Sequence, residues 1–325
     1  MESMSTTRHG AAILSSALIV PLVLHLLTLE EAPPSRRLIL GVLSARDHFK
    51  EREAIRQTWG SALQRLSDVE MKFVLGDHDC PIHPADRTSA YGCEMWDLNQ
   101  VLEYKFLRTR KNALTKWHQS SCPLVSAQFA IADKGSLMGH EEHRVRRAEE
   151  WRQHLANLQL KVEEEGRRHQ DLLKLPHLDV YTNLPHKVMS FLSWTAYRQN
   201  GSYVMKVDDD TFVNVSLLNA LAEVEEEEEH VWWSLFHHHR SVPTYGKWAD
   251  LTYPSLTYPT FPAGAGYLMT RSLVRAVVDA QHHLAAHGGE DVSLGIWVSS
   301  SACQGIVSGG DLKADRGLKS LRSVL

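Results

Sequence analysis

The chain has 325 residues, of which 43% are hydrophobic and 23% are charged, and its formal net charge is −4. This length and apolar content suffice for one large domain, or two small ones, with a real core. The slight negative charge argues against a general nucleic-acid-binding protein. The 19 histidines are scattered apart from one run at His237–His239, and they do not follow the spacing of structural zinc sites.

The N-terminal segment contains a candidate membrane helix. Residues 11–29, AAILSSALIVPLVLHLLTL, carry no formal charge, and about 20 apolar residues suffice to span a bilayer as a helix. No A-x-A-like cleavage site closes the run, which favours a single-pass signal anchor over a signal peptide that is removed. We therefore expect a short tail at 1–10, an anchor at 11–29 and a stem at 30–37.

The first elements predicted after the stem alternate between strand and helix. Arg37–Ala45, RLILGVLSA, is apolar almost throughout and suits a buried parallel strand. A helix is expected over REAIRQTWG, ending at Gly60, and Val69–Asp77 is expected to form a second buried strand. This β-α-β order is the opening of a doubly wound α/β domain. No element is assigned between about 85 and 133.

A strongly charged helix is predicted over residues 141–173, as an insert in the domain. Its apolar side chains recur at helical spacing, with Glu and Arg between them, which indicates a solvated amphipathic helix. The apolar positions are Val145, Trp151, Leu155, Leu158 and Leu160. A coiled coil that binds a partner is the alternative interpretation.

The remaining chain continues the strand–helix alternation as far as Val298, so we expect one α/β catalytic domain over 38–298. The predicted elements are a strand end, turn and helix over 178–201, a strand over SYVMKVDDD, a helix over 219–229, a strand over HVWWSLF, a strand over 266–270, a helix over 271–289 closed by Gly288–Gly289, and a last helix that begins at EDVSLGIWV.

Whether the cysteines pair and whether the glycosylation sequons are used depends on the compartment that contains the chain. Cys80 and Cys93 flank a turn-rich segment and could form a disulfide in an oxidising lumen. Four free thiols are the alternative. Of the two N-x-S/T sequons, Asn200 lies in a predicted turn and is the better acceptor, whereas Asn214 lies in a predicted strand.

Three adjacent aspartates, Asp208–Asp210, lie between two apolar runs that both indicate strand. Buried like charges repel and are costly to desolvate, so these carboxylates need a partner. Strand alternation puts Asp208 and Asp210 on one face and Asp209 on the other. Carboxylates favour Mg²⁺ or Mn²⁺. One carboxylate on a metal and another on a ribose hydroxyl would hold a nucleoside diphosphate as a leaving group.

A second acidic motif is GGEDVSLGIW, in which Glu290 and Asp291 begin a helix directly after a Gly-Gly turn. The helix dipole favours anions there, so an ordinary helix N-terminus is one interpretation. The other is a general base presented from a rigid helix end.

Aromatic residues and glycines occur between these two motifs. Sugars present apolar C–H faces that stack on aromatic rings, and glycine lets the backbone approach a ligand closely. The candidates are Trp232, Trp233, Trp248, Tyr258, Gly264 and Gly266. Ordinary packing is the alternative, and only one of the adjacent Trp232 and Trp233 can face a cleft because neighbouring strand residues point opposite ways.

Four ordered motifs over Gly41–Trp297 resemble the β-1,3-glycosyltransferase family of the secretory pathway. They are GVLSARDHFKEREAIRQTWG, DLLKLPHLDVYTNLPHKVMSFLSW, VMKVDDDTFVNV and GEDVSLGIW. Three further stretches are most similar to a family member that transfers N-acetylgalactosamine: VWWSLF, YGKWADLTYPSLTYPTF and HDCPIHPADRTSAYGC.

The resemblance implies an α/β fold of the GT-A type, with a Rossmann-like central sheet. It implies Mn²⁺ and a UDP-sugar donor carrying GalNAc, Gal or GlcNAc. The sugar would pass with inversion to the 3-hydroxyl of a glycan on a glycoprotein, with a β-linked GlcNAc as the expected acceptor end. It also implies a type II anchor, with the catalytic domain in the lumen of the Golgi or endoplasmic reticulum.

The resemblance also implies roles for individual residues. Asp210 would bind the metal, Asp208 would face the ribose beside Asp209, and Asp291 would be the catalytic base. The nucleotide would lie near Ser44, Arg52 and Arg56. The sugar and acceptor side would be lined by Trp232, Trp233, Trp248, Tyr258, Gly264, Gly266 and Glu290.

The chain departs from the family after Val298, where family members continue with cysteines and often a metal-binding His. Residues 299–325 are small, polar and Gly/Ser-rich, which predicts an atypical, poorly ordered tail. Ala263 stands where relatives often carry Cys. An alternative function is therefore an anchored glycan-binding or chaperone-like module that keeps the transferase fold. A metal-dependent phosphohydrolase that uses the aspartates is a second alternative.

Overall fold

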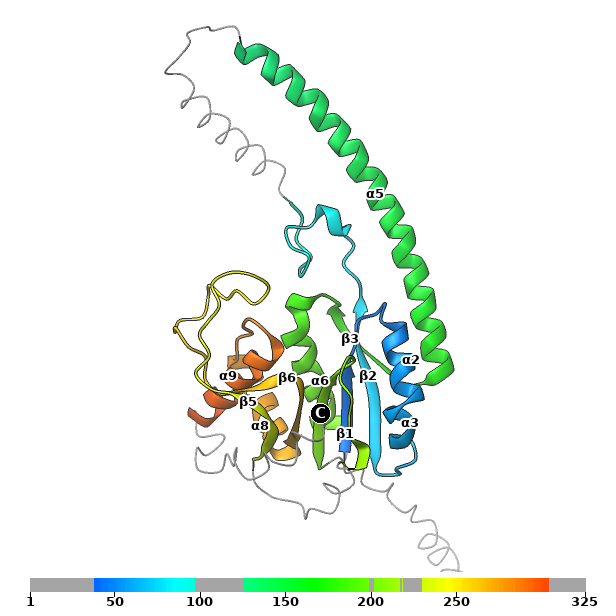
Figure 1. Cartoon of the computed structure of the whole chain (residues 1–325), viewed down its shortest axis with the longest axis vertical. Coiled ribbons are helices and arrows are strands. Elements are labelled where there is room, and N and C mark those ends of the chain that lie inside the picture. The colour runs from blue at the N-terminus through cyan, green and yellow to red at the C-terminus, as the bar shows by residue number, and fades with distance from the viewer. Residues whose placement is uncertain (1–37, 97–124, 199–201, 217, 219–229, 304–325) are drawn as a thin grey trace, which may run out of the picture.

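A six-stranded mixed sheet organises the computed structural model, which describes residues 38–96, 125–198, 202–216, 218 and 230–303 (Figure 1). The strand order is β3-β2-β1-β4-β6-β5. Strands β3, β2, β1 and β4 are mutually parallel, whereas β6 runs antiparallel to both β4 and β5. The strands are β1 (Leu38–Leu43), β2 (Val69–His78), β3 (Leu172–Leu178), β4 (Tyr203–Asp208), β5 (Trp232–His237) and β6 (Phe261–Thr270).

Helices cover both faces of the sheet, as expected when parallel strands are buried on both sides. Apolar residues of α6, α8 and α9 pack together on one face, and those of α2, α3 and α5 pack on the other. The α-helices are α2 (Phe49–Gln57), α3 (Trp59–Leu63), α5 (Val125–His169), α6 (Leu184–Arg198), α8 (Arg271–Asp279) and α9 (Glu290–Cys303); the 3-10 turns are η1 (Pro84–Asp86), η2 (Tyr181–Asn183) and η3 (Gln281–His283).

The central strands confirm the pattern of buried parallel strands. All six residues of β1 are buried, and in β4 only Asp208 at the end is partly exposed. Gly41 in β1 allows close packing of a helix, because a Cβ there would lie 2.3 Å from the Phe191 ring of α6. This packing holds the strand end that precedes Ser44 in a fixed position.

Helix α5 is much longer than predicted. It has 45 residues and ends at His169, before Leu172 and Leu173, which belong to β3. Figure 1 shows its C-terminal part beside α2 and α3 and its N-terminal part projecting beyond the sheet. Leu158 and Val162 are buried against the domain, but the predicted apolar positions Val145 and Leu160 are exposed. The face of α5 that packs against the domain includes the buried Glu165, which a pattern of apolar residues alone does not predict.

Several predicted boundaries are wrong. Gly60 does not end the first helix, because α2 ends at Gln57 and Gly60 lies inside α3. The run after the aspartates is not a strand. Strand β6 begins at Phe261, five residues before the prediction. Helix α8 ends at Asp279, well before Gly288–Gly289. Residues 299–303, assigned to the tail, continue α9.

A disulfide joins Cys80 and Cys93, whose Cα atoms lie 5.6 Å apart, in agreement with the pairing expected from the sequence. It closes a loop after β2. The backbone N–H of Thr182 donates to the carbonyl of Tyr91 at 3.0 Å, which ties this loop to the segment that follows β3.

Some predictions lie outside the described residues: the tail, anchor and stem at 1–37, the helix at 219–229, the acceptor Asn200 and residues 304–325. Within the described ranges, no helix is both long and apolar enough to cross a membrane.

Candidate functional site

The acidic motif lies at the edge of the sheet where the carboxyl ends of β1 and β4 meet. Leu43 and Asp208 are paired in register, and the backbone N–H of Asp209 donates to the Leu43 carbonyl at 3.2 Å. In the sheet, β2 lies on one side of β1 and β4 lies on the other. This is a topological switch point, where open α/β sheets bind ligands outside the strand ends.

Lys206 neutralises the acidic end of β4 from within the core. Its side chain is fully buried, and its Nζ lies 2.7 Å from Asp208 Oδ1 and 2.8 Å from Glu290 Oε1. It also donates to the carbonyl of Gly264. Burial lowers the pKa of Lys206, but Glu290 and Asp208 outweigh this and raise it to about 12. Lys206 therefore stays charged at neutral pH and joins β4, β6 and α9.

The other two aspartates have different surroundings. Asp209 Oδ2 lies 2.8 Å from His48 Nδ1, in the loop after β1. Burial lowers the pKa of His48, but its hydrogen bond and attraction to Asp209 outweigh this and raise it. Asp210 is exposed. The chain turns directly after Asp208, so the alternation of side chains between the two faces of the sheet ends there. Each of the three carboxylates therefore has different surroundings.

Glu290 and Asp291 converge on the backbone of Gly264 from the N-terminus of α9. A Cβ at Gly264 would lie 3.2 Å from Glu290 Oε1 and 3.3 Å from Asp291 Oδ2, so both carboxylates line the space that glycine leaves open. Asp291 Oδ1 accepts from its neighbouring Val292 N–H at 2.7 Å. Glu290 is 6% exposed and is held by Lys206, whereas the second carboxyl oxygen of Asp291 faces Gly264.

The electrostatics of this site raise the pKa values of two of its carboxyl groups. Burial, followed by repulsion from Glu290, raises the pKa of Asp291 to about 6. Burial also raises the pKa of Asp208 to about 6, against the attraction of Lys206. A carboxyl with a pKa near 6 is still ionised at neutral pH and is a stronger base than an ordinary aspartate, as general-base catalysis requires.

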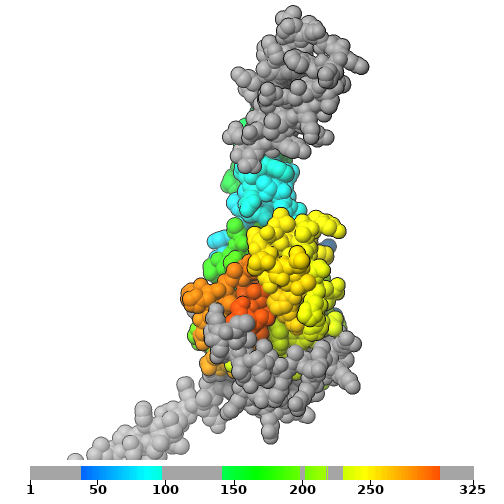
Figure 2. All heavy atoms as spheres, turned by 90° about the vertical axis from the view of Figure 1, so that its left-hand side faces the viewer, coloured from blue at the N-terminus to red at the C-terminus, as the bar shows by residue number. Residues whose placement is uncertain are grey.

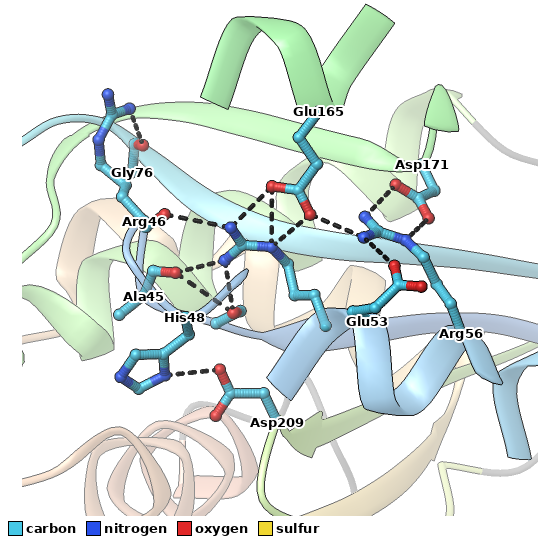
Figure 3. Close-up of polar contacts among 11 residues, drawn as sticks. Ala45, Arg46, His48, Glu53, Arg56, Gly76, Glu165, Asp171 and Asp209 are labelled. Atoms are coloured by element: carbon cyan, nitrogen blue, oxygen red, sulfur yellow. Dashed lines mark hydrogen bonds and ion pairs between the residues drawn. The ribbon is translucent and has the colours of Figure 1, made fainter. Parts of the chain in front are cut away.

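The predicted nucleotide residues Arg52 and Arg56 both pair with carboxylates of the protein, and Figure 3 labels Arg56 with Glu165 and Asp171. Arg52 is fully buried, donates to Glu165 of α5 at 2.7 Å and also binds the Ser44 hydroxyl at 3.0 Å and the Ala45 carbonyl at 2.5 Å. Arg56 lies 2.8 Å from Asp171 and from Glu165. Both guanidinium groups connect α2 to α5, and the expected position of the nucleotide near them stays a prediction. Ser44 does lie at the switch point, although its hydroxyl accepts from Arg52.

The predicted sugar-facing residues separate into two groups. Trp232 and Trp233 pack against opposite faces of the sheet, and Trp233 makes an edge contact with Tyr203. The structure does not bring them to the site. Trp248 is 60% exposed, and its Nε1 donates to the Tyr181 hydroxyl at 3.1 Å.

The remaining predicted residues are Tyr258, Gly264 and Gly266. Tyr258 is buried, and its hydroxyl donates to Asp250 at 3.3 Å. Gly264 lies at the carboxylates, whereas Gly266 is paired with Val207 and its carbonyl accepts from Ser234. Gly266 therefore lies within the hydrogen-bonded sheet.

Three residues of the site were missed from the sequence: Lys206, His48 and Tyr181. A lone Lys in the buried run YVMKV was the available signal for Lys206, because a buried cation needs carboxylate partners. No pattern distinguishes His48 or Tyr181, since their positions depend on how separate strands meet.

Among the described residues, a divalent cation at this site would need substrate oxygens to complete its coordination. The described residues contain no group of three or more His, Cys, Asp or Glu side chains placed to hold an ion alone. Nucleotide sites commonly use one or two carboxylates, with substrate phosphates and water completing the coordination. The exposed Asp210 at the switch point provides such an oxygen donor.

Gly264→Ala is expected to lower turnover without unfolding the protein. The new methyl group would contact Glu290 and Asp291 at 3.2–3.3 Å, so both carboxylates must shift by a few tenths of an ångström. A misplacement of this kind can cost roughly tenfold to a hundredfold in rate. The measurement is kcat beside a thermal melt. Gly166→Ala is the control, because its Cβ would meet only Leu172 at 3.7 Å; equal effects of both substitutions would contradict the assignment.

Comparisons with known proteins agree with the motifs. A family model described as Galactosyltransferase matches residues 153–305. A Xenopus tropicalis protein named UDP-GalNAc:beta-1,3-N-acetylgalactosaminyltransferase 2 is 34% identical, with 81% of each chain covered. Its Xenopus laevis namesake is 24% identical over 83% of each chain. Mouse Beta-1,3-galactosyltransferase 6 is 31% identical over 54% of this chain and 50% of its own.

Proposed function

This chain belongs to the galactosyltransferase family of β-1,3-glycosyltransferases, glycosyltransferase family 31, and from that membership we propose that it is an inverting β-1,3-glycosyltransferase. It moves a hexose from a UDP-sugar to the 3-hydroxyl of a glycan on a glycoprotein. The donor sugar is GalNAc, with Gal and GlcNAc as the other candidates. The relatives named for GalNAc transfer support this choice, and a β-linked GlcNAc is the proposed acceptor end.

The observation that carries the proposal is the position of Asp291. Its carboxylate lies at Gly264 beside Glu290, while Lys206 connects Glu290 to Asp208 at the switch point. One buried cation thus joins a candidate nucleotide-binding carboxylate, Asp208, to Glu290, the residue next to the candidate base. In this arrangement an acceptor hydroxyl and a donor sugar can meet between two fixed elements, β4 and α9.

In the proposed mechanism the transfer is a single displacement. Asp291 removes the proton from the acceptor 3-hydroxyl as that oxygen attacks C1 of the donor sugar. The bond between C1 and the phosphate oxygen breaks, and UDP leaves with the bonding electrons. The anomeric configuration inverts because attack and departure occur on opposite faces. Glu290 stays paired with Lys206, and the backbone N–H of Val292 holds one oxygen of the Asp291 carboxyl group.

The donor would be held by Asp208–Asp210. Asp210 would bind Mn²⁺ together with the diphosphate, Asp208 would face the ribose, and Asp209 is fixed by His48. When bound, the metal would neutralise the negative charge of the departing UDP. We also propose a type II orientation in the Golgi or endoplasmic reticulum, anchored by residues 11–29; the Cys80–Cys93 disulfide fits an oxidising lumen.

A donor panel tests the proposed function. UDP release is measured from UDP-GalNAc, UDP-Gal and UDP-GlcNAc, with and without methyl β-N-acetylglucosaminide, in the presence and absence of Mn²⁺. We expect release that depends on both acceptor and Mn²⁺ and is fastest with UDP-GalNAc. Inorganic phosphate released without acceptor would favour a phosphohydrolase. UDP binding with no release from any donor would favour a glycan-binding module.

The rate of transfer is expected to fall below pH 6. The pKa of Asp291 is raised to about 6, so the ionised base is lost as the pH falls through 6, and kcat/KM should drop roughly tenfold per unit below it. The folded state binds this proton more tightly than the unfolded chain does, so Asp291 itself makes the fold more stable as the pH falls from 6 toward 4. A pH profile of kcat/KM, beside thermal melts, checks this. A flat profile between pH 5 and 7 would contradict it.

A further inference from the structure

A buried carboxylate in the loop between β5 and β6, that of Asp250, takes no part in the proposed reaction. Asp250 is 7% exposed, and a carboxylate is costly to bury in its ionised form unless hydrogen bonds satisfy its oxygens. Burial raises the pKa of Asp250, but its hydrogen bonds to Thr252 and the nearby His287 outweigh this and lower it. Asp250 therefore stays ionised at neutral pH.

The two oxygens of Asp250 bind different parts of the chain. Oδ1 accepts from the loop itself, from the Thr252 hydroxyl at 2.7 Å and from the backbone N–H groups of Thr252 and Tyr253 at 3.0 and 3.1 Å. Oδ2 accepts from the backbone N–H of Gly288 at 3.3 Å and lies 3.2 Å from His287 Nδ1. One carboxylate thus joins the loop to the bend just before α9.

Helix α9 holds the same bend from its other side. Ser293, which is fully buried, accepts from the His287 N–H at 2.9 Å and donates to the His287 carbonyl at 2.7 Å. The indole N–H of Trp297 donates to the carbonyl of Ala285 at 2.7 Å. Figure 2 shows the yellow surface of the loop next to the orange-red surface of α9. The bend therefore follows a fixed path between the loop and the helix.

The position of the bend determines where the candidate base lies. Gly289 directly follows the residues that Asp250 binds, and a Cβ at Gly289 would lie only 2.7 Å from Asp291 Oδ1. On the other side, a Cβ at Gly264 would lie 3.3 Å from Asp291 Oδ2. The Asp291 carboxylate is thus packed between two glycines, one in the bend and one in β6. A shift of the bend would displace the carboxylate from its place beside Gly264.

We propose that Asp250 is a positioning residue for Asp291. Through Oδ2 it fixes the bend at Gly288, and the bend keeps the Asp291 carboxylate directed at Gly264, where the acceptor hydroxyl is deprotonated. Oδ1 folds the loop, so the two oxygens of one side chain have separable roles. Asp250 acts through Asp291 and is assigned no contact with either substrate. This inference deepens the proposed function and rests on it.

Asp250→Asn separates the two roles. The amide oxygen can still accept from the loop, but the NH₂ group that replaces Oδ2 cannot accept from Gly288. His287 and the Tyr258 hydroxyl, which donates to Oδ2 at 3.3 Å, can each become an acceptor, whereas the Gly288 N–H cannot. We expect kcat to fall roughly tenfold to a hundredfold, as for a small misplacement of a catalytic group. The KM of the UDP-sugar should stay within about twofold.

Thr252→Val is the matched control. Thr252 is exposed, and its hydroxyl binds the same carboxylate on the loop side alone. The melting temperature should fall by roughly 2–4 °C, while kcat stays within about twofold. Equal losses of kcat in Thr252→Val and Asp250→Asn would overturn the separate role of Oδ2. If Asp250→Asn does not fold, His287→Leu, which removes one partner of Oδ2, takes its place in the comparison.

NMR titration measures the position of the base without turnover. The carboxyl carbon of Asp291 is observed in protein labelled with ¹³C-aspartate and is assigned with Asp291→Asn. Burial and repulsion from Glu290 raise the pKa of Asp291, and Lys206 opposes them, so its titration midpoint depends on where the carboxylate lies.

A midpoint displaced by at least about 0.5 pH units in Asp250→Asn, but not in Thr252→Val, supports the proposal. It does so even if no donor releases UDP, in which case only the proposed function fails. A midpoint that is unchanged in Asp250→Asn, or displaced equally in both variants, overturns the positioning role and leaves the proposed transfer intact.

Discussion

Lys206→Met should destabilise the protein by roughly 3–5 kcal/mol, the cost of leaving buried charges without their partner. Lys206 is the shared partner of Asp208 and Glu290 and is fully buried. Methionine preserves most of the side-chain volume, so the loss of stability measures the effect of removing the charge. For a domain of this size the melting temperature should fall by roughly 10 °C. Thermal and urea unfolding measure the change.

Two further variants make this expectation specific. Glu290→Gln in the Lys206→Met background removes one of the two carboxylate charges left without a partner and should restore part of the lost stability. Lys174→Met changes an exposed lysine in the edge strand β3 and should have an effect within about 0.5 kcal/mol. If Lys206→Met and Lys174→Met were equally stable, Lys206 would not neutralise the acidic end of β4.

Asp291→Asn should lower kcat by roughly a hundredfold to ten-thousandfold, the range that general-base catalysis contributes. Asparagine preserves the shape and can still accept from the Val292 N–H, but it cannot take up the hydroxyl proton. The fold should be as stable as the wild type or slightly more so, because the repulsion between Asp291 and Glu290 is removed. Single-turnover kinetics isolates the chemical step from product release.

Affinity for UDP and Mn²⁺ provides the internal control for Asp291→Asn. Because Asp291 acts on the acceptor, the dissociation constant of UDP–Mn²⁺ measured by calorimetry should stay within about twofold. Asp279→Asn, which changes an exposed acid on α8, should alter neither quantity. Equal losses of transfer and of UDP binding would reject Asp291 as the base.

Local patterns predicted the parts of the fold in which apolar residues decide the structure. The strands β1, β2, β4 and β5 and the helices α6 and α9 follow continuous or periodic apolar runs, and each was expected close to its observed place. The predicted helix end at Gly60 is wrong because, in the sequence, a glycine inside a packed helix resembles one at a helix end. The prediction that Val145 and Leu160 lie on the inward face is wrong because the helix projects beyond the domain or faces solvent at these positions.

The site was predictable in its acidic residues but not in their partners. Asp208–Asp210 and Asp291 are recognisable as motifs, whereas the pairing of Lys206 with Glu290 joins β4 to α9 across 84 positions. Arg52 and Arg56 belong to a recognisable motif as well, yet their carboxylate partners come from α5 and the segment after it, 113 and 115 positions away. Such partnerships depend on tertiary contacts, which residue spacing does not contain.

The stereochemistry of the product tests the central claim most directly. The chain is incubated with UDP-GalNAc, Mn²⁺ and methyl β-N-acetylglucosaminide, and the product is examined by proton NMR. A displacement in which Asp291 deprotonates the acceptor predicts a new β-linked sugar at the 3-oxygen, formed from the α-linked donor. An α-linked product, attachment at another oxygen, or free sugar and UDP as the sole products would contradict it.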